Sequence, residues 1–201
     1  MSRPRILGLT GSIGMGKTTT AAMFADAGVP VWDADAAVHR LYGPGGAAAQ
    51  AVAGLCPEAV GPAGVDRASL KHWLARTPDG LARLEGAVHP LVAADRAAFI
   101  DRAAGQGAPL VVLDIPLLFE TGADRTCDVT VTVSASQDVQ RARVLARPGM
   151  TEDVLDQLLA RQMPDAEKRA RADHVIDTSA METARAAVAQ LLSRYRRSAD
   201  A

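Results

Sequence analysis

The chain has 201 residues, a length typical of one large domain or two small ones. Hydrophobic residues make up 48% of it and charged residues 22%, as in ordinary globular proteins. The formal net charge of −1 gives no overall attraction to nucleic acid or to an anionic membrane, so we expect neither as a partner. No apolar run reaches the roughly 18 residues that would cross a bilayer, and the N-terminus leads directly into a strand-like segment. We therefore expect a cytoplasmic protein, and the sequence leaves its oligomeric state open.

Short apolar runs and helical patterns alternate along the chain. The apolar runs predict five buried parallel strands, at residues 6–10, 29–33, 110–115, 129–133 and 174–177. Helical patterns lie at residues 17–27, 68–76, 80–104, 137–146, 152–162, 166–172 and 179–196. This alternation predicts an α/β fold, in which helices cover both faces of a doubly wound, five-stranded parallel sheet.

The stretch between the second and third strands is too long for a single crossover helix. We predict that residues 36–108 form a helical insertion, and that this insertion binds the substrate. Clusters of glycine and proline predict turns within residues 42–64. Pro90 lies inside a helical pattern, and the residue before a proline disfavours helical geometry, so we expect a break near His89.

A glycine-rich segment lies directly between the first strand and the first helix. Residues 11–18 match the phosphate-loop pattern G-x4-G-K-[ST] in the strand-to-helix context that this pattern requires. Its glycines let successive backbone N–H groups point at phosphate oxygens, and the helix N-terminus adds partial positive charge. Lys17 brings a full charge to the β- and γ-phosphates, and Thr18 offers a hydroxyl to Mg²⁺. We predict a P-loop NTPase-type fold whose ATP-binding residues include Gly11, Ser12, Ile13, Gly14, Met15, Gly16, Lys17, Thr18 and Thr19.

Phosphate loops serve GTPases, mechanical or regulatory ATPases, and small-molecule kinases. GTPases commonly read guanine with an Asn-Lys-x-Asp motif, and this chain contains no asparagine. Motor ATPases carry an Asp-Glu pair after the third strand, where this chain has residues 114–116, Asp-Ile-Pro. Asp33 and Asp35 favour a kinase, because the carboxyl ends of strands line the site in α/β sheets. A carboxylate there can accept the proton of an alcohol and help to hold Mg²⁺ through water.

Two arginines spaced four residues apart share one helical face after the fourth strand. Arg143 and Arg147 lie where P-loop kinases carry a mobile lid, which we expect at about residues 137–165. Guanidinium groups can neutralise the negative charge that spreads during γ-phosphoryl transfer, so we predict a catalytic role for both. Outside the insertion and the lid, the predicted core comprises residues 1–35, 109–136 and 166–201.

Several segments together resemble the dephospho-CoA kinase family, over nearly the whole chain. The most specific is residues 114–120, Asp-Ile-Pro-Leu-Leu-Phe-Glu, which is close to identical to the family's third-strand signature. Gln140, Arg143 and Arg147 match the family's lid pattern. Further matches lie at residues 8–18, 31–35, 44–45, 65–70, 88–92, 162–164, 168 and 172–177.

The resemblance implies transfer of the γ-phosphoryl group of ATP to the ribose 3′-hydroxyl of dephospho-CoA, the last step of coenzyme A synthesis. It implies that Asp35 is the general base, that Lys17 and Mg²⁺ stabilise the transferring group, and that the lid arginines close over it. The family has asparagine where this chain has Thr178, in a turn implied to hold adenine, so the chain lacks that amide for base selection. The implied acceptor-binding residues are Asp33, Asp35, Arg67, His89, Leu117, Leu118 and Glu120.

Two other functions stay open beside this one. A small-metabolite kinase of the shikimate or gluconate type shares the phosphate loop and the carboxylates after the second strand, but does not need the signature at residues 116–120. A non-catalytic regulatory module would bind the nucleotide without turnover. The identity of the phosphorylated product separates the three functions.

Overall fold

The computed structural model describes residues 3–197, and its chain divides into two compact units. The first unit comprises Met1–Trp32 and Arg102–Ala201, and the second comprises Asp33–Asp101. The insertion that we predicted at residues 36–108 falls largely within the second unit. Among the described residues, no helix is long and apolar enough to cross a membrane.

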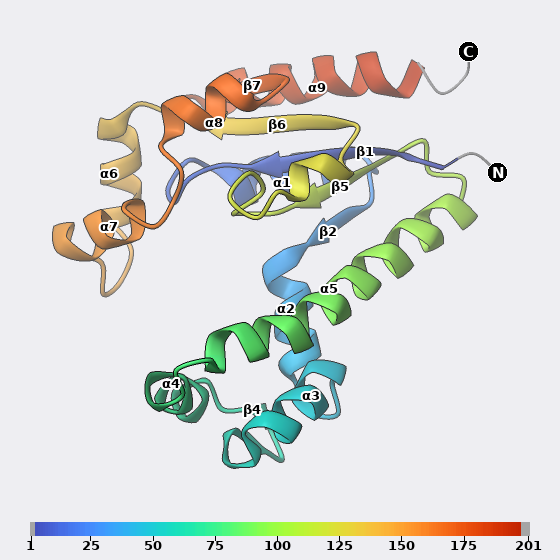
Figure 1. Ribbon diagram of the computed structural model, residues 1–201. Coiled ribbons are helices and arrows are strands. Elements are labelled where there is room, and N and C mark those ends of the chain that lie inside the picture. The colour runs from blue at the N-terminus through green and yellow to red at the C-terminus, as the bar shows by residue number, and fades with distance from the viewer. Residues whose placement is uncertain (1–2, 198–201) are drawn as a thin grey trace. The chain divides into compact units, whose positions relative to one another are not determined.

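The first unit contains a five-stranded sheet, as predicted (Figure 1). Its strands follow the order β2-β5-β1-β6-β7, which places β1 at the centre. Around Leu7 the register is parallel on both sides, with Val112 of β5 on one side and Val129 of β6 on the other. The strand bounds are Arg5–Thr10 (β1), Val31–Asp33 (β2), Leu110–Asp114 (β5), Val129–Ser134 (β6) and His174–Asp177 (β7).

Helices pack on both faces of this sheet, and for that reason the central strands β1, β5 and β6 are buried almost throughout. Leu7 and Leu9 of β1 pack with Phe24 and Leu191 of the helices on one face. On the other face, a Cβ added to Gly8 would lie 2.7 Å from the Cys127 sulfur, so only glycine fits there. The helices of this unit are α1 (Lys17–Asp26), α6 (Gln137–Leu145), α7 (Glu152–Leu159), α8 (Asp165–Arg171), α9 (Met181–Arg197) and the short η2 (Ala123–Thr126).

The second unit is helical, and it has its own apolar core. Ala48 and Val52 of one helix pack with Leu70, Trp73 and Leu84 of the others. Fully burying side chains of this size stabilises a fold by about 1.5–3 kcal/mol each. Its elements are α2 (Ala34–Tyr42), α3 (Ala47–Leu55), η1 (Pro57–Ala59), β3 (Val60–Gly61), β4 (Gly64–Val65), α4 (Arg67–Arg76) and α5 (Gly80–Gly105), the last four residues of which belong to the first unit.

Sequence patterns did not predict the helices α2 and α3, and they predicted a break in α5 that the structure does not have. The helix α3 lies inside the stretch for which we predicted only turns; its residues are mostly alanine, so they carry little apolar periodicity although Ala48 and Val52 are buried. The break expected near His89 is wrong, since α5 runs unbroken through Pro90. A proline inside a helix costs about 3 kcal/mol. Burial of Leu84 and Val88 in the apolar core offsets this cost.

Acid should weaken the first unit partly through Asp173, whose Oδ2 accepts hydrogen bonds from the Thr130 N–H and hydroxyl, both at 2.8 Å. The Thr130 backbone hydrogen bond is the largest cause that lowers the pKa of Asp173 below its ordinary value of 3.8. A lowered pKa in the folded state contributes stability above pH 3.8, and this contribution is lost as the pH falls through the folded pKa.

We therefore expect Asp173→Asn to destabilise the protein at pH 7 by about 1 kcal/mol, because Asp173 is exposed and solvent screens its charge. The difference from the unsubstituted protein should shrink towards pH 2. Urea unfolding at both pH values measures it, with exposed Asp101→Asn as the matched control. An equal loss at both pH values would contradict this account.

Candidate active site

The phosphate loop connects β1 to α1 and presents unpaired backbone donors. Gly14 and Gly16 have φ angles of 79° and 85°, a left-handed geometry that favours glycine. Within residues 3–197, the N–H groups of Gly14, Gly16, Lys17 and Thr18 donate to no recorded acceptor. Unpaired N–H groups at the start of a helix form an anion-binding site, which fits the predicted role in holding phosphates.

Packing holds the loop in this shape from beneath. A Cβ on Gly11 would lie 2.9 Å from the Val133 carbonyl oxygen, and one on Gly14 would lie 2.6 Å from a methyl carbon of Val144. Both distances are too short for real contacts, so the loop can approach β6 and α6 only through glycine. The Met15 N–H donates to the Ser12 carbonyl at 3.1 Å, which closes the turn.

Lys17 forms an ion pair with Asp114, a residue to which sequence reasoning gave no function. Asp114 is the last residue of β5, and its side chain is almost fully buried. It pairs in the sheet with Leu9, just before the phosphate loop. Its place at the carboxyl end of the strand next to β1 was the signal that could have identified it. The pair supplies the charge balance that a buried carboxylate requires.

The oxygen groups near the loop suit a hard divalent cation. The Thr18 side chain is exposed, and the Asp114 carboxylate lies at the neighbouring Lys17. No group of three or more His, Cys, Asp or Glu side chains able to hold a metal occurs in the described part of the chain. Mg²⁺ typically takes one or two protein oxygens and the phosphates of its substrate, so these donors fit it.

Beside the loop lies a cavity of about 260 Å³, lined by Gly14, Gly16, Thr19, Arg143, Arg147 and Thr178, among others. The structure therefore brings both lid arginines and Thr178 to the phosphate loop. The Arg143 guanidinium donates to the Thr178 carbonyl oxygen at 2.6 Å and lies 3.3 Å from its hydroxyl oxygen. That hydroxyl in turn donates to the Met15 carbonyl at 2.8 Å. Thr178 thus ties Arg143 to the loop.

The predicted acceptor-binding residues of the second unit lie at its surface. Asp33 caps α2, because its Oδ1 accepts a hydrogen bond from the Ala36 N–H at 2.9 Å. Asp35 lies exposed in the first turn of that helix, and no polar partner is recorded for it among residues 3–197. Arg67 begins α4 and His89 lies within α5, both with exposed side chains.

The other predicted acceptor residues follow β5 in the first unit and differ in their surroundings. Leu117 is 38% exposed, whereas Leu118 is fully buried and shapes the surface only from beneath. Glu120 forms an ion pair with the fully buried Lys168, at 2.8 Å. Sequence reasoning gave no role to this lysine, because a charged residue in a helix is usually solvated.

A phosphate loop at the centre of this parallel sheet, with Arg143 and Arg147 lining the cavity beside it, is the arrangement of a P-loop kinase. The model of the dephospho-CoA kinase family matches residues 5–183. The dephospho-CoA kinase of Cereibacter sphaeroides is 57% identical over 199 residues, which cover 99% of this chain and 100% of the relative. The chain belongs to the dephospho-CoA kinase family.

Solved structures agree with this assignment of the fold. A Thermus thermophilus protein is 35% identical and superimposes with a TM-score of 0.77, covering 96% of this chain and 98% of its own. The dephospho-CoA kinase from Campylobacter jejuni has a TM-score of 0.65 at 16% identity, with coverage of 96% and 98%. At that identity the second comparison supports the fold alone.

Proposed function

We propose that the protein transfers the γ-phosphoryl group of ATP to the ribose 3′-hydroxyl of dephospho-CoA, which yields coenzyme A and ADP. This reaction is the last step of coenzyme A biosynthesis. The observation that carries the proposal is the family match, because it spans both the phosphate loop and the whole second unit. A small-metabolite P-loop kinase would account for the loop and the carboxylates after β2, but not for the signature at residues 116–120.

In the proposed reaction, Asp35 accepts the proton of the 3′-hydroxyl while the hydroxyl oxygen attacks the γ-phosphorus. The bond from that phosphorus to the oxygen bridging the β- and γ-phosphates breaks, and ADP leaves. The Asp35 carboxylate is exposed, so it is accessible to a substrate hydroxyl. Lys17 and the unpaired amides of the loop hold the phosphates and stabilise the charge that develops on them.

The divalent metal of this kinase is proposed to be Mg²⁺, held by the Thr18 hydroxyl and the phosphates of ATP. When bound, Mg²⁺ neutralises phosphate charge. With ATP bound, Lys17 would pair with the phosphates in place of Asp114, and the Asp114 carboxylate would help to hold the hydrated metal. These two residues would change partners together.

The cavity beside the loop, which Arg143, Arg147 and Thr178 line, is proposed to hold the nucleotide. The hydroxyl hydrogen of Thr178 is already used on the Met15 carbonyl oxygen. Thr178 therefore contributes shape rather than a hydrogen bond to adenine. The acceptor is proposed to contact Asp33, Arg67, His89, Leu117 and Glu120, with Leu118 beneath.

Purified protein, incubated with ATP, Mg²⁺ and one acceptor at a time, tests the function. The acceptors are dephospho-CoA, shikimate and gluconate, and mass spectrometry identifies the product. We expect coenzyme A from dephospho-CoA and no product from the other two. A Lys17→Ala preparation controls for contaminating kinases. Phosphorylation of shikimate or gluconate but not of dephospho-CoA would refute the proposal, and a lack of transfer to any acceptor would indicate a regulatory module.

A further inference from the structure

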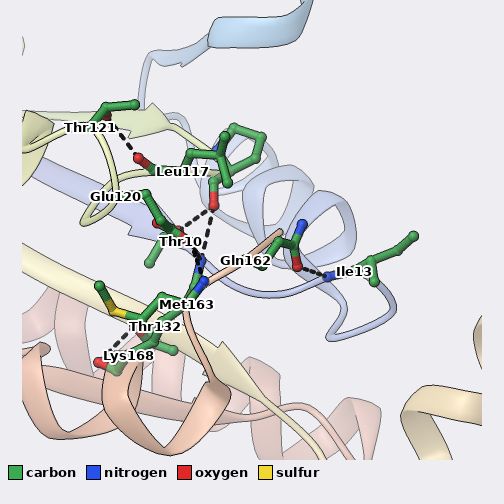
Figure 2. A network of polar contacts seen from close by, with 10 residues as sticks. Thr10, Ile13, Leu117, Glu120, Thr121, Thr132, Gln162, Met163 and Lys168 are labelled. Atoms are coloured by element: carbon green, nitrogen blue, oxygen red, sulfur yellow. Dashed lines mark hydrogen bonds and ion pairs between the residues drawn. The ribbon is translucent and has the colours of Figure 1, made fainter. Parts of the chain in front are cut away.

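Both ends of the lid are attached to the phosphate loop, and both attachments use the backbone of Ile13. From α6, the Gln140 side chain donates from Nε2 to the Ile13 carbonyl oxygen at 2.7 Å. After α7, the Gln162 side chain accepts the Ile13 N–H at 3.1 Å through Oε1 (Figure 2). The main chain of Ile13 is therefore held by two glutamines that lie 22 positions apart in the sequence. We call these two hydrogen bonds the Ile13 clamp.

A polar network around the buried Lys168 holds the segment next to Gln162. Lys168 Nζ lies 2.8 Å from Glu120 Oε1 and 3.2 Å from the Pro116 carbonyl oxygen. The same Glu120 oxygen accepts the Met163 N–H at 2.9 Å, next to Gln162 (Figure 2). A fully buried ammonium is costly unless it is paired in this way, so the network holds the segment at residues 162–163 in one place.

The pKa of Glu120 agrees with this network. Burial alone would raise this pKa, but the hydrogen bonds from Lys168 and from the Met163 N–H lower it below the ordinary value. Glu120 therefore stays ionised at neutral pH, and its charge holds Lys168 and the end of the lid together.

The end of the clamp at Gln140 leads directly to the lid arginines. Gln140 is 4% exposed, and a Cβ on Gly14 would lie only 3.0 Å from its carbonyl oxygen and 3.2 Å from its Cγ, so Gln140 packs closely against the loop. Arg143 lies one helical turn further along α6, and Arg147 follows the end of that helix. Any shift of Ile13 relative to α6 would therefore move both guanidinium groups relative to the loop.

We propose that Gln140 and Gln162 are positioning residues for phosphoryl transfer, because the Ile13 clamp fixes Arg143 and Arg147 relative to the phosphate loop. Neither glutamine needs to touch the reacting atoms. The Ile13 N–H belongs to the phosphate loop, and it donates to Gln162. The proposal deepens the proposed kinase function and rests on it.

The decisive experiment combines Gln162→Met with Arg147→Ala in a double-mutant cycle. Methionine keeps the length of glutamine and removes the acceptor. We expect Gln162→Met to lower kcat about tenfold, with KM for dephospho-CoA changed less than twofold. In the Arg147→Ala background the same substitution should lower kcat clearly less than tenfold, because only Arg143 is then left for the clamp to position. Gln157→Met, on the exposed side of α7, is the matched control with unchanged kcat.

Amide hydrogen exchange, measured by NMR on the whole protein, tests the clamp without turnover. The Ile13 amide should exchange at least tenfold faster in Gln162→Met than in the unsubstituted protein, while the Leu9 amide of β1 keeps its rate. Gln140→Met gives an independent version of the kinetic test. Unchanged kcat in Gln162→Met, a tenfold loss that persists in the Arg147→Ala background, or an unprotected Ile13 amide in the unsubstituted protein would overturn the proposal. Lack of coenzyme A formation by the unsubstituted protein would instead count against the proposed function.

Discussion

Asp35→Asn should keep ATP binding while kcat falls at least ~100-fold, the scale expected when a general base is removed. Asparagine has nearly the shape of aspartate, but its amide does not accept the proton of the ribose hydroxyl. The side chain is exposed in the first turn of α2, so the substitution should leave the fold intact. Calorimetric titration with a non-hydrolysable ATP analogue and steady-state kinetics with dephospho-CoA measure the two quantities.

The control for this experiment is Asp26→Asn, at the exposed end of α1. It changes the net charge by the same amount, and it should change neither kcat nor ATP affinity. An Asp35→Asn variant that loses ATP affinity as strongly as turnover would contradict the assignment, since Asp35 would then serve the metal or the local structure.

Lys17→Ala should weaken both ATP binding and turnover, with a loss of about 10²–10³-fold in kcat/KM for ATP. The lysine is a preorganised positive charge for the transferring phosphoryl group, and the removal of one such group typically costs this much. Calorimetric titration with the ATP analogue and steady-state kinetics measure the two effects.

The same substitution removes the positive charge of Lys17 from the buried Asp114 carboxylate, so a lower melting temperature should accompany these losses. The double variant Lys17→Ala with Asp114→Asn separates the two effects. It should recover most of the melting temperature but not the turnover. If ATP affinity were unchanged in Lys17→Ala, the phosphate loop would not be the nucleotide site.

Local sequence patterns predicted the core because each strand had a strong local signature. The runs that form β1, β5 and β6 are buried almost throughout, and the phosphate-loop motif requires a strand and a helix around it. The patterns did not predict the alanine-rich α3 or the continuity of α5, because packing between side chains that are distant in the sequence stabilises these helices. A residue-by-residue pattern contains no such information.

The candidate site, like the fold, was predicted only in part from the sequence. Lys17 lies in the phosphate loop that the motif predicted, and Arg143 and Thr178 line the cavity beside this loop. The roles of Asp114 and Lys168 depend on partners that are distant in the sequence. Asp114, at the end of β5, pairs with Lys17, and the buried Lys168 pairs with Glu120. Whether Asp35 and the acceptor residues act as predicted is for the experiments above.

The tightly packed glycines of the phosphate loop limit how this sequence can diverge. Gly11 and Gly14 are required by the backbone of β6 and by the side chains of α6, whether or not a nucleotide binds. A descendant that had abandoned catalysis would still be selected to keep them, simply in order to fold. Loss of Lys17, which this packing does not require, would be the informative sign of such a pseudoenzyme.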